Sequence, residues 1–325
     1  MEIKEHFLAK ISRPSVSGIC FRERLFRLID KGWSLPILWV TGPPGSGKTV
    51  LVASYLEARG LPCLWYQIDE RDSDIGTFFY YMGMAARKAA PRKRKALPLL
   101  TSEYLAGIPA FTRRFFEELY SRLGSRSIPM RRGDRPKVPA AKAAGKHAFI
   151  IVLDNYQDIP AGLAFHDMMA HALDVIPEGG RVIIMSRNEP PPALARLHAN
   201  NRSHVLGWNE IRLTLEETSE VLYAKGERKL PKEAVAEIHK RTNGWVAALV
   251  LMILNVRSQG IEYPPFLRNI PKELIFYLEN EIFRKADRER QDFLLKTVFL
   301  SKMTAQMAEK LTGITRAGAD SERTE

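Results

Sequence analysis

Leu-Pro-Ile-Leu-Trp-Val-Thr (residues 35–41) and Gly-Pro-Pro-Gly-Ser-Gly-Lys-Thr (residues 42–49) together decide the fold. The first heptad is an apolar run, typical of a buried strand, and it leads directly into a turn rich in glycine and proline. Residues 49–57 then have the spacing of a helix. The turn matches the pattern GxxxxGK(S/T) in full, and a strand before it with a helix after it is the context that a P-loop requires. The sequence therefore predicts a loop whose backbone N–H groups wrap around phosphates.

Each constrained position of this loop has an expected task. Lys48 is expected to reach the β- and γ-phosphates of a nucleotide, and the hydroxyl of Thr49 is expected to ligate Mg²⁺. The helix that follows adds the positive end of its dipole. The nucleotide is expected to be ATP or ADP, and the residues expected to bind it are Gly42, Pro43, Pro44, Gly45, Ser46, Gly47, Lys48 and Thr49.

Two further strand ends carry polar residues that suit the same site. Asp154 ends the apolar run 149–154 and is expected to hold Mg²⁺, directly or through water. Many P-loop ATPases have a second acid immediately afterwards, but here that position is Asn155, and an amide cannot accept a proton from water as a carboxylate does. Asp158 is the possible substitute. Arg187 follows the next buried strand and is expected to sense the γ-phosphate or stabilise its charge. These residues predict slow hydrolysis at most.

Strand-like and helix-like segments alternate through the first two hundred residues. The strands are apolar throughout, which indicates a mostly parallel sheet covered on both faces, and hence the α/β class. The pattern changes near residue 210, where Thr214 and Glu217 form a capping-box signature. Asn243–Gly244 is a helix stop, and a helical stretch from Lys272 to about Leu311 follows a proline-containing linker.

Composition limits the remaining possibilities. Hydrophobic residues make up 45% of the 325, so a sizeable core can form, and two cysteines do not provide a disulfide framework. No apolar run is long enough to span a bilayer, so a cytoplasmic location is expected. The net charge is +12, and two local segments account for all of it. Residues 87–95 carry six Lys/Arg without an acid, and residues 124–147 form a basic, flexible insertion with seven Lys/Arg and one acid.

The order of these motifs resembles that of MalT-type regulators, which are ATP-dependent transcription activators of the LuxR type and of the STAND class of NTPases. The resemblance spans roughly residues 10–312. Six segments carry it, in addition to the P-loop: Lys10-Ile-Ser-Arg-Pro14, Phe21-Arg-Glu-Arg-Leu25, Trp65-Tyr66-Gln-Ile-Asp69-Glu70, Leu153-Asp-Asn-Tyr-Gln157, Ser186-Arg-Asn188 and Thr242-Asn-Gly-Trp-Val-Ala-Ala-Leu249.

The resemblance implies a domain order. An entry segment (1–25) precedes a P-loop NTPase domain (26–209), a small helical domain (210–262) and a partial winged-helix region with a polar tail (270–325). It also implies that Arg22 lies near the nucleotide. In this family ADP favours a closed resting state, whereas ATP with an inducer favours an open, self-associating state. The sensor and helix-turn-helix domains of complete members are absent from the sequence, so DNA binding is not expected and the chain is expected to be a truncated switch module.

Two other functions fit parts of the sequence. A free-standing ATPase or ATP-dependent phosphotransferase would need a competent base or an acceptor site, and Asn155 argues against it. A nucleic-acid-binding protein would use the segments 87–95 and 124–147 through salt-sensitive electrostatic contacts, although such segments are more often solvated loops.

Overall fold

The computed structural model describes residues 9–16, 19–93, 95–124, 149–226, 230–259, 272–300 and 303–313. The basic insertion predicted at 124–147, the proline-containing linker and the polar tail lie outside the described residues, except for Gly124. Within the described part, no helix has both the length and the apolar character needed to cross a membrane.

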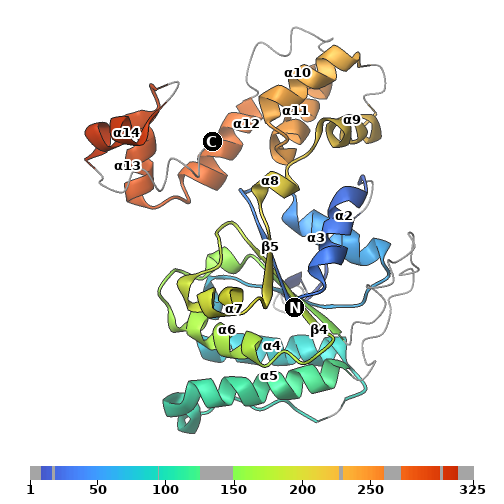
Figure 1. The fold of residues 1–325 in the computed structure, drawn as a ribbon, viewed down its shortest axis with the longest axis vertical. Coiled ribbons are helices and arrows are strands. Elements are labelled where there is room, and N and C mark those ends of the chain that lie inside the picture. The colour runs from blue at the N-terminus through green and yellow to red at the C-terminus, as the bar shows by residue number, and fades with distance from the viewer. Residues whose placement is uncertain are drawn as a thin grey trace. The chain divides into compact units, whose positions relative to one another are not determined.

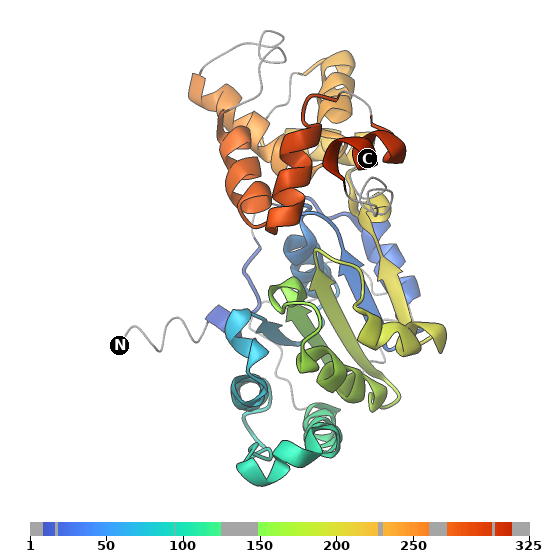
Figure 2. The same ribbon diagram turned by 90° about the vertical axis from the view of Figure 1, so that its left-hand side faces the viewer.

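The centre of the fold is a parallel sheet. Its strands are β1 (Ile37–Thr41), β2 (Leu64–Gln67), β3 (Phe149–Asp154), β4 (Gly180–Ser186) and β5 (Ser203–Leu206). Within the described residues they form one five-stranded sheet in the order β2-β3-β4-β1-β5, and each neighbouring pair is parallel. Figure 2 shows the strands side by side, with the yellow strand β5 at one edge. This architecture confirms the predicted α/β P-loop fold, and it brings the carboxyl ends of β1, β3 and β4 to one edge.

Helices cover both faces of this sheet, as the uniformly apolar strands predicted. Along the chain as a whole, the helices among the described residues, most of them beyond those that cover the sheet, are α2 (Glu23–Gly32), α3 (Lys48–Ala58), α4 (Ile75–Ala89), α5 (Ile108–Gly124), α6 (Ala164–Asp174), α7 (Ala195–Ala199), α8 (Trp208–Ile211), α9 (Leu215–Ala224), α10 (Lys232–Thr242), α11 (Val246–Gln259), α12 (Lys272–Tyr277), α13 (Arg288–Thr297) and α14 (Ala305–Thr312). Short 3-10 turns include η1 (Glu70–Ser73), η2 (Ser102–Gly107), η4 (Tyr156–Asp158) and η5 (Pro192–Leu194), and a π-helical segment, η7, spans Leu278–Phe283.

The core around the sheet consists of two layers, one on each face. Alternate side chains of a strand point to opposite faces, so Trp39 and Leu153 join one layer while Val40 and Val152 join the other. The first layer is filled from α4, α5 and α6, and the second from α2 and α3 (Figure 1). The aromatic run 78–81 contributes Phe78 and Phe79 to the first layer, as core packing. Because helices cover both faces, the carboxyl ends of the strands are where a ligand site on this sheet is expected.

Local signals in the sequence fix the ends of several helices. Asp74 caps α4 by accepting a hydrogen bond from the Thr77 backbone N–H at 2.8 Å. The predicted capping box at the start of α9 is present, because Thr214 and Glu217 each accept a hydrogen bond from the other's backbone N–H. Asn243 ends α10 in the left-handed conformation, as the predicted helix stop requires.

Contacts divide the chain into two compact units, Met1–Leu249 and Val250–Glu325. This division falls inside α11 and does not coincide with the domain boundaries expected from the sequence, which remain predictions. In the second unit the helical stretch expected from Lys272 is interrupted where Asp287 caps α13. Helices α13 and α14 pack on one another through Phe293 and Ala308.

Candidate nucleotide-binding site

The P-loop connects the end of β1 to the start of α3. Its shape depends on Gly47, whose φ of 87° lies in the left-handed region that a side chain disfavours. With Gly47 in this conformation, α3 begins at Lys48 without a side-chain cap, so its first N–H groups are not occupied by a capping side chain. The loop therefore has the backbone that phosphate binding requires.

Lys48 lies over the loop from which it emerges. Its Nζ donates hydrogen bonds to the carbonyl oxygens of Gly42 at 2.6 Å and Pro43 at 3.1 Å, and to Ser46 Oγ at 3.3 Å. The pKa of Lys48 is lowered to about 8, mainly by burial and also by the charge of Arg187, while the charge of Asp154 opposes the shift. Arg187 and Asp154 are therefore both within electrostatic reach of Lys48.

Thr49 and Asp154 meet directly. The hydroxyl of Thr49 lies 3.1 Å from one carboxylate oxygen of Asp154 and 3.3 Å from the other. Asp154 is only 5% exposed, and burial raises its pKa although the bond from Thr49 opposes the rise. A hydroxyl and a carboxylate on adjacent elements are the oxygen ligands that Mg²⁺ uses in P-loop sites, so this donor pair fits that ion.

The turn after Asp154 joins the acid strand to the next strand end. Asn155 adopts a left-handed conformation (φ 60°, ψ 40°), and its N–H donates to Asp154 Oδ1 at 3.0 Å. Gln157 then accepts a hydrogen bond from the Arg187 N–H at 3.1 Å and donates one to Asp158 Oδ1 at 3.0 Å. The sequence predicts no partner for Gln157, because a polar residue in a short turn gives no signal of its partner on another strand.

The helical segment after residue 240 contacts the P-loop itself. The indole Nε1 of Trp245 donates to the Pro44 carbonyl at 2.9 Å, and the Ala247 N–H donates to the Gly45 carbonyl at 3.0 Å. The chain reaches this position through Gly244, which has a φ of 74° and whose carbonyl accepts from the Leu213 N–H at 2.9 Å. The start of α11 is thus bonded to two carbonyls of the loop.

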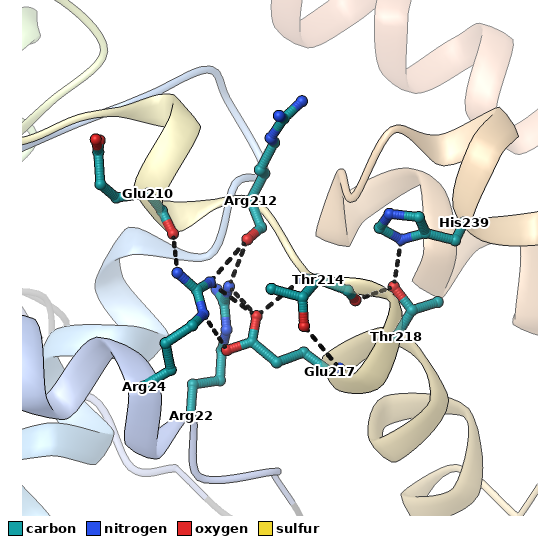
Figure 3. A network of polar contacts seen from close by, with 8 residues as sticks. All are labelled: Arg22, Arg24, Glu210, Arg212, Thr214, Glu217, Thr218 and His239. Atoms are coloured by element: carbon teal, nitrogen blue, oxygen red, sulfur yellow. Dashed lines mark hydrogen bonds and ion pairs between the residues drawn. The ribbon is translucent and has the colours of Figure 1, made fainter. Parts of the chain in front are cut away.

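The entry segment is bonded to α9 by two arginines. Arg22 Nη2 donates to Glu217 at 2.8 Å and to the Arg212 carbonyl at 2.9 Å, and Arg24 also pairs with Glu217 (Figure 3). Burial would raise the pKa of Glu217, but the bonds from Arg24 and Arg22 outweigh it and lower that pKa. Arg22 was predicted from the resemblance to lie near the nucleotide, and the contacts of its guanidinium are with Glu217 and the 212 carbonyl.

The acidic cluster after β2 serves the fold. Asp72 is fully buried and accepts hydrogen bonds from Tyr66 Oη at 2.7 Å and Lys10 Nζ at 2.8 Å. Lys10 also pairs with Asp69 at 2.7 Å. These contacts hold the segment containing Lys10 against β2 and the η1 turn that follows it.

The parallel sheet, the loop and the acid at the end of β3 define the class of this protein as a nucleotide-binding P-loop NTPase. A family model described as nephrocystin 3, N-terminal, matches residues 21–187, and the chain belongs to this family. The chain is also a homologue of MalT regulators and a MalT-like NTPase of the STAND class.

Two relatives and one solved structure illustrate these similarities. The HTH-type transcriptional regulators MalT of Klebsiella pneumoniae strain 342 and of Klebsiella pneumoniae subsp. pneumoniae strain ATCC 700721 / MGH 78578 are each 23% identical to this chain over 311 residues. Those residues are 94% of this chain and 32% of each relative, so the chain spans about a third of their length. A Walker-type ATPase of Pyrococcus abyssi shares the fold, with a TM-score of 0.52 and 15% identity over 92% of this chain and 89% of that one.

Proposed function

We propose that this chain is an ATP/ADP switch module of a MalT-like transcription regulator, with Mg²⁺ as its metal. The observation that carries the proposal is the pair of hydrogen bonds from Trp245 and Ala247 to the carbonyls of Pro44 and Gly45. Because this segment is bonded to the phosphate-binding loop, a change in the conformation of the loop would alter the position of the segment.

The loop, one ammonium and one arginine would bind the polyphosphate. Lys48 would exchange its bonds to the Gly42 and Pro43 carbonyls for bonds to the β- and γ-phosphates, and Arg187 would approach the γ-phosphate from the end of β4. Thr49 and Asp154 would hold Mg²⁺, which supplies positive charge beside the phosphates when it is bound. The two nucleotides can have different effects on a conformational equilibrium only through contacts that one makes and the other does not, and a contact of Arg187 with the γ-phosphate would be of this kind.

Hydrolysis is proposed to be slow. Asn155 stands where a second acid would take the proton of the attacking water, and an amide oxygen is far too weak a base for that task. Asp158 is tied to the amide of Gln157 at 3.0 Å. A module that retains its nucleotide for long periods suits a regulator, and self-association in the ATP state would be its output.

The test is nucleotide binding by calorimetry, with ATP and ADP in the presence of Mg²⁺, followed by sedimentation of each complex. We expect both nucleotides to bind, turnover to be slow, and self-association to increase with ATP. Lys48→Ala should weaken binding at least about tenfold through the loss of one charge-assisted contact, and Lys240→Ala, an exposed lysine on α10, is the matched control. Equal affinities of Lys48→Ala and the wild type would refute the proposal. Rapid turnover that depends on Asp154 would favour the free-standing ATPase instead.

A further inference from the structure

Gln157 connects the end of β3 to the end of β4, and the proposed switch needs these two strand ends at a fixed distance and orientation. It lies in the η4 turn after Asp154, and its side-chain oxygen accepts the hydrogen bond of the Arg187 N–H at 3.1 Å. We propose that Gln157 is the positioning residue that aims Arg187 at the γ-phosphate, and that it thereby sets the preference of the site for ATP over ADP. This inference rests on the proposed function, because it assumes that the site binds both nucleotides.

The amide of Gln157 has one permitted orientation. Its oxygen can only accept and its nitrogen can only donate, and its two partners are a backbone N–H and the carboxylate of Asp158. If the amide were flipped, its NH2 group would face the Arg187 N–H, donor against donor. Its oxygen would then face the Asp158 carboxylate, acceptor against acceptor. The side chain is therefore held at both ends, so it can fix the peptide that precedes the Arg187 side chain.

The residues around this bond are held by other contacts. Trp39 Nε1 donates to the Asn188 carbonyl at 3.0 Å, and the Asn188 N–H donates to Ser186 Oγ at 3.1 Å. The η4 turn is held independently, since the Tyr156 ring packs edge-on against Trp39 with centroids 5.1 Å apart and its hydroxyl pairs with buried His166 at 3.0 Å. Loss of the Gln157 bond should therefore weaken the hold on the Arg187 peptide without unfolding either strand end.

Electrostatics explain why Arg187 needs such a hold. Its charge is one of the causes that lower the pKa of Lys48, so the two cations repel one another across the site. A flexible arginine would relieve this repulsion by moving toward solvent. When the γ-phosphate arrives, a side chain that is already in place loses less entropy than one that must be recruited. Since ADP lacks the γ-phosphate, only ATP benefits from this preorganisation.

The experiment measures the ratio of the ADP and ATP dissociation constants in the full chain, in the presence of Mg²⁺. Gln157→Leu removes both amide bonds at similar volume, whereas Gln157→Glu retains an acceptor for the Arg187 N–H. We expect Gln157→Leu to reduce the preference for ATP by about five- to tenfold, a typical coupling between two sites, while ADP affinity changes less than about twofold. Gln157→Glu should recover part of the preference. Gln67→Leu, at the exposed end of β2, is the matched control.

A double-mutant cycle distinguishes positioning from a direct effect. If Gln157 acts through Arg187, then Gln157→Leu should have no further effect on the ratio when Arg187 is already replaced by Ala. Independent effects of the two substitutions would overturn the inference, as would an unchanged ratio in Gln157→Leu with ADP binding and melting temperature intact. If Gln157→Leu does not fold, Gln157→Glu provides the test. Because this variant keeps an acceptor for the Arg187 N–H, a ratio of dissociation constants equal to that of Arg187→Ala would refute the inference. A wild-type chain that binds ADP and ATP equally refutes only this inference, whereas a chain that binds neither refutes the proposed function.

Discussion

At the residue scale, the most informative group is Lys48, because burial and a neighbouring arginine act on its charge in the same direction. Its pKa is lowered to about 8, so the ammonium loses its proton within an accessible pH range. Bound phosphates favour the charged form and would raise that pKa again, so nucleotide binding must take up a proton above pH 8. The terminal phosphate itself, with a pKa of about 6 in simple phosphomonoesters, has already ionised by then.

We therefore predict that ATP affinity falls as the pH rises above 8. The decrease should approach about tenfold per pH unit, which is the limit for a single linked proton. Calorimetry between pH 7 and 9.5 measures it, and buffers of different ionisation enthalpy reveal the proton uptake. Lys48→Ala serves as the control, since it should bind weakly at each pH. A slope that persists in Lys48→Ala would assign the proton to another group.

At the scale of elements, the decisive feature is the turn between α10 and α11. Gly244 has a φ of 74°, and a Cβ at this position would overlap the carbonyl oxygen of Leu213 and lie 2.9 Å from its nitrogen. Backbone cannot yield as a flexible side chain does. An added methyl group must therefore move the start of α11, which carries Trp245 and its bond to the Pro44 carbonyl.

Gly244→Ala is predicted to destabilise the protein by about 3 kcal/mol or more and to weaken nucleotide binding. Gly162→Ala is the matched control, because its φ of 80° imposes the same left-handed strain while an added Cβ would have nothing within 4 Å. That control should cost only about 1 kcal/mol and leave nucleotide affinity unchanged. Chemical denaturation and calorimetry give the two quantities. Equal losses of stability in both variants would show that strain alone matters at residue 244.

At the scale of the whole molecule, the contacts divide the chain into two compact units. The P-loop, Asp154, Arg187 and Trp245 all belong to the unit Met1–Leu249. A ligand stabilises the structure to which it binds, by about 2.7 kcal/mol at a hundredfold excess over Kd. We therefore expect a bound nucleotide to stabilise the first unit more than the second.

We predict that ATP with Mg²⁺ slows amide hydrogen exchange in the P-loop, in the η4 turn and at the start of α11. Exchange in α13 and α14 should change little, since those helices pack through Phe293 and Ala308 in the second unit. Hydrogen-exchange mass spectrometry with and without nucleotide measures both. The Lys48→Ala chain with nucleotide is the control. Protection of α13 equal to that of the P-loop would contradict the prediction.

The sequence by itself determined the local features of the site. The P-loop, the strand that leads into it, the acid at the end of β3 and the capping box of Thr214 depend on residues close together in the chain, so spacing and residue type were sufficient to predict them. The α/β class followed from strands that are apolar throughout. Strand β5 was missed because its residues, Ser-His-Val-Leu, include two polar side chains at an edge that is only partly buried.

Only the tertiary structure decided which distant residues became partners. The sequence predicts Glu217 as a capping residue, but it does not predict the pairing of Glu217 with Arg22 and Arg24, which lie almost two hundred residues away. The same holds for Gln157 with Arg187 and for Trp245 with the Pro44 carbonyl. Such pairs depend on the order of parallel strands and on the path of the backbone through Gly244. Neither leaves a periodic pattern in the sequence, because the geometry arises from packing of the whole unit.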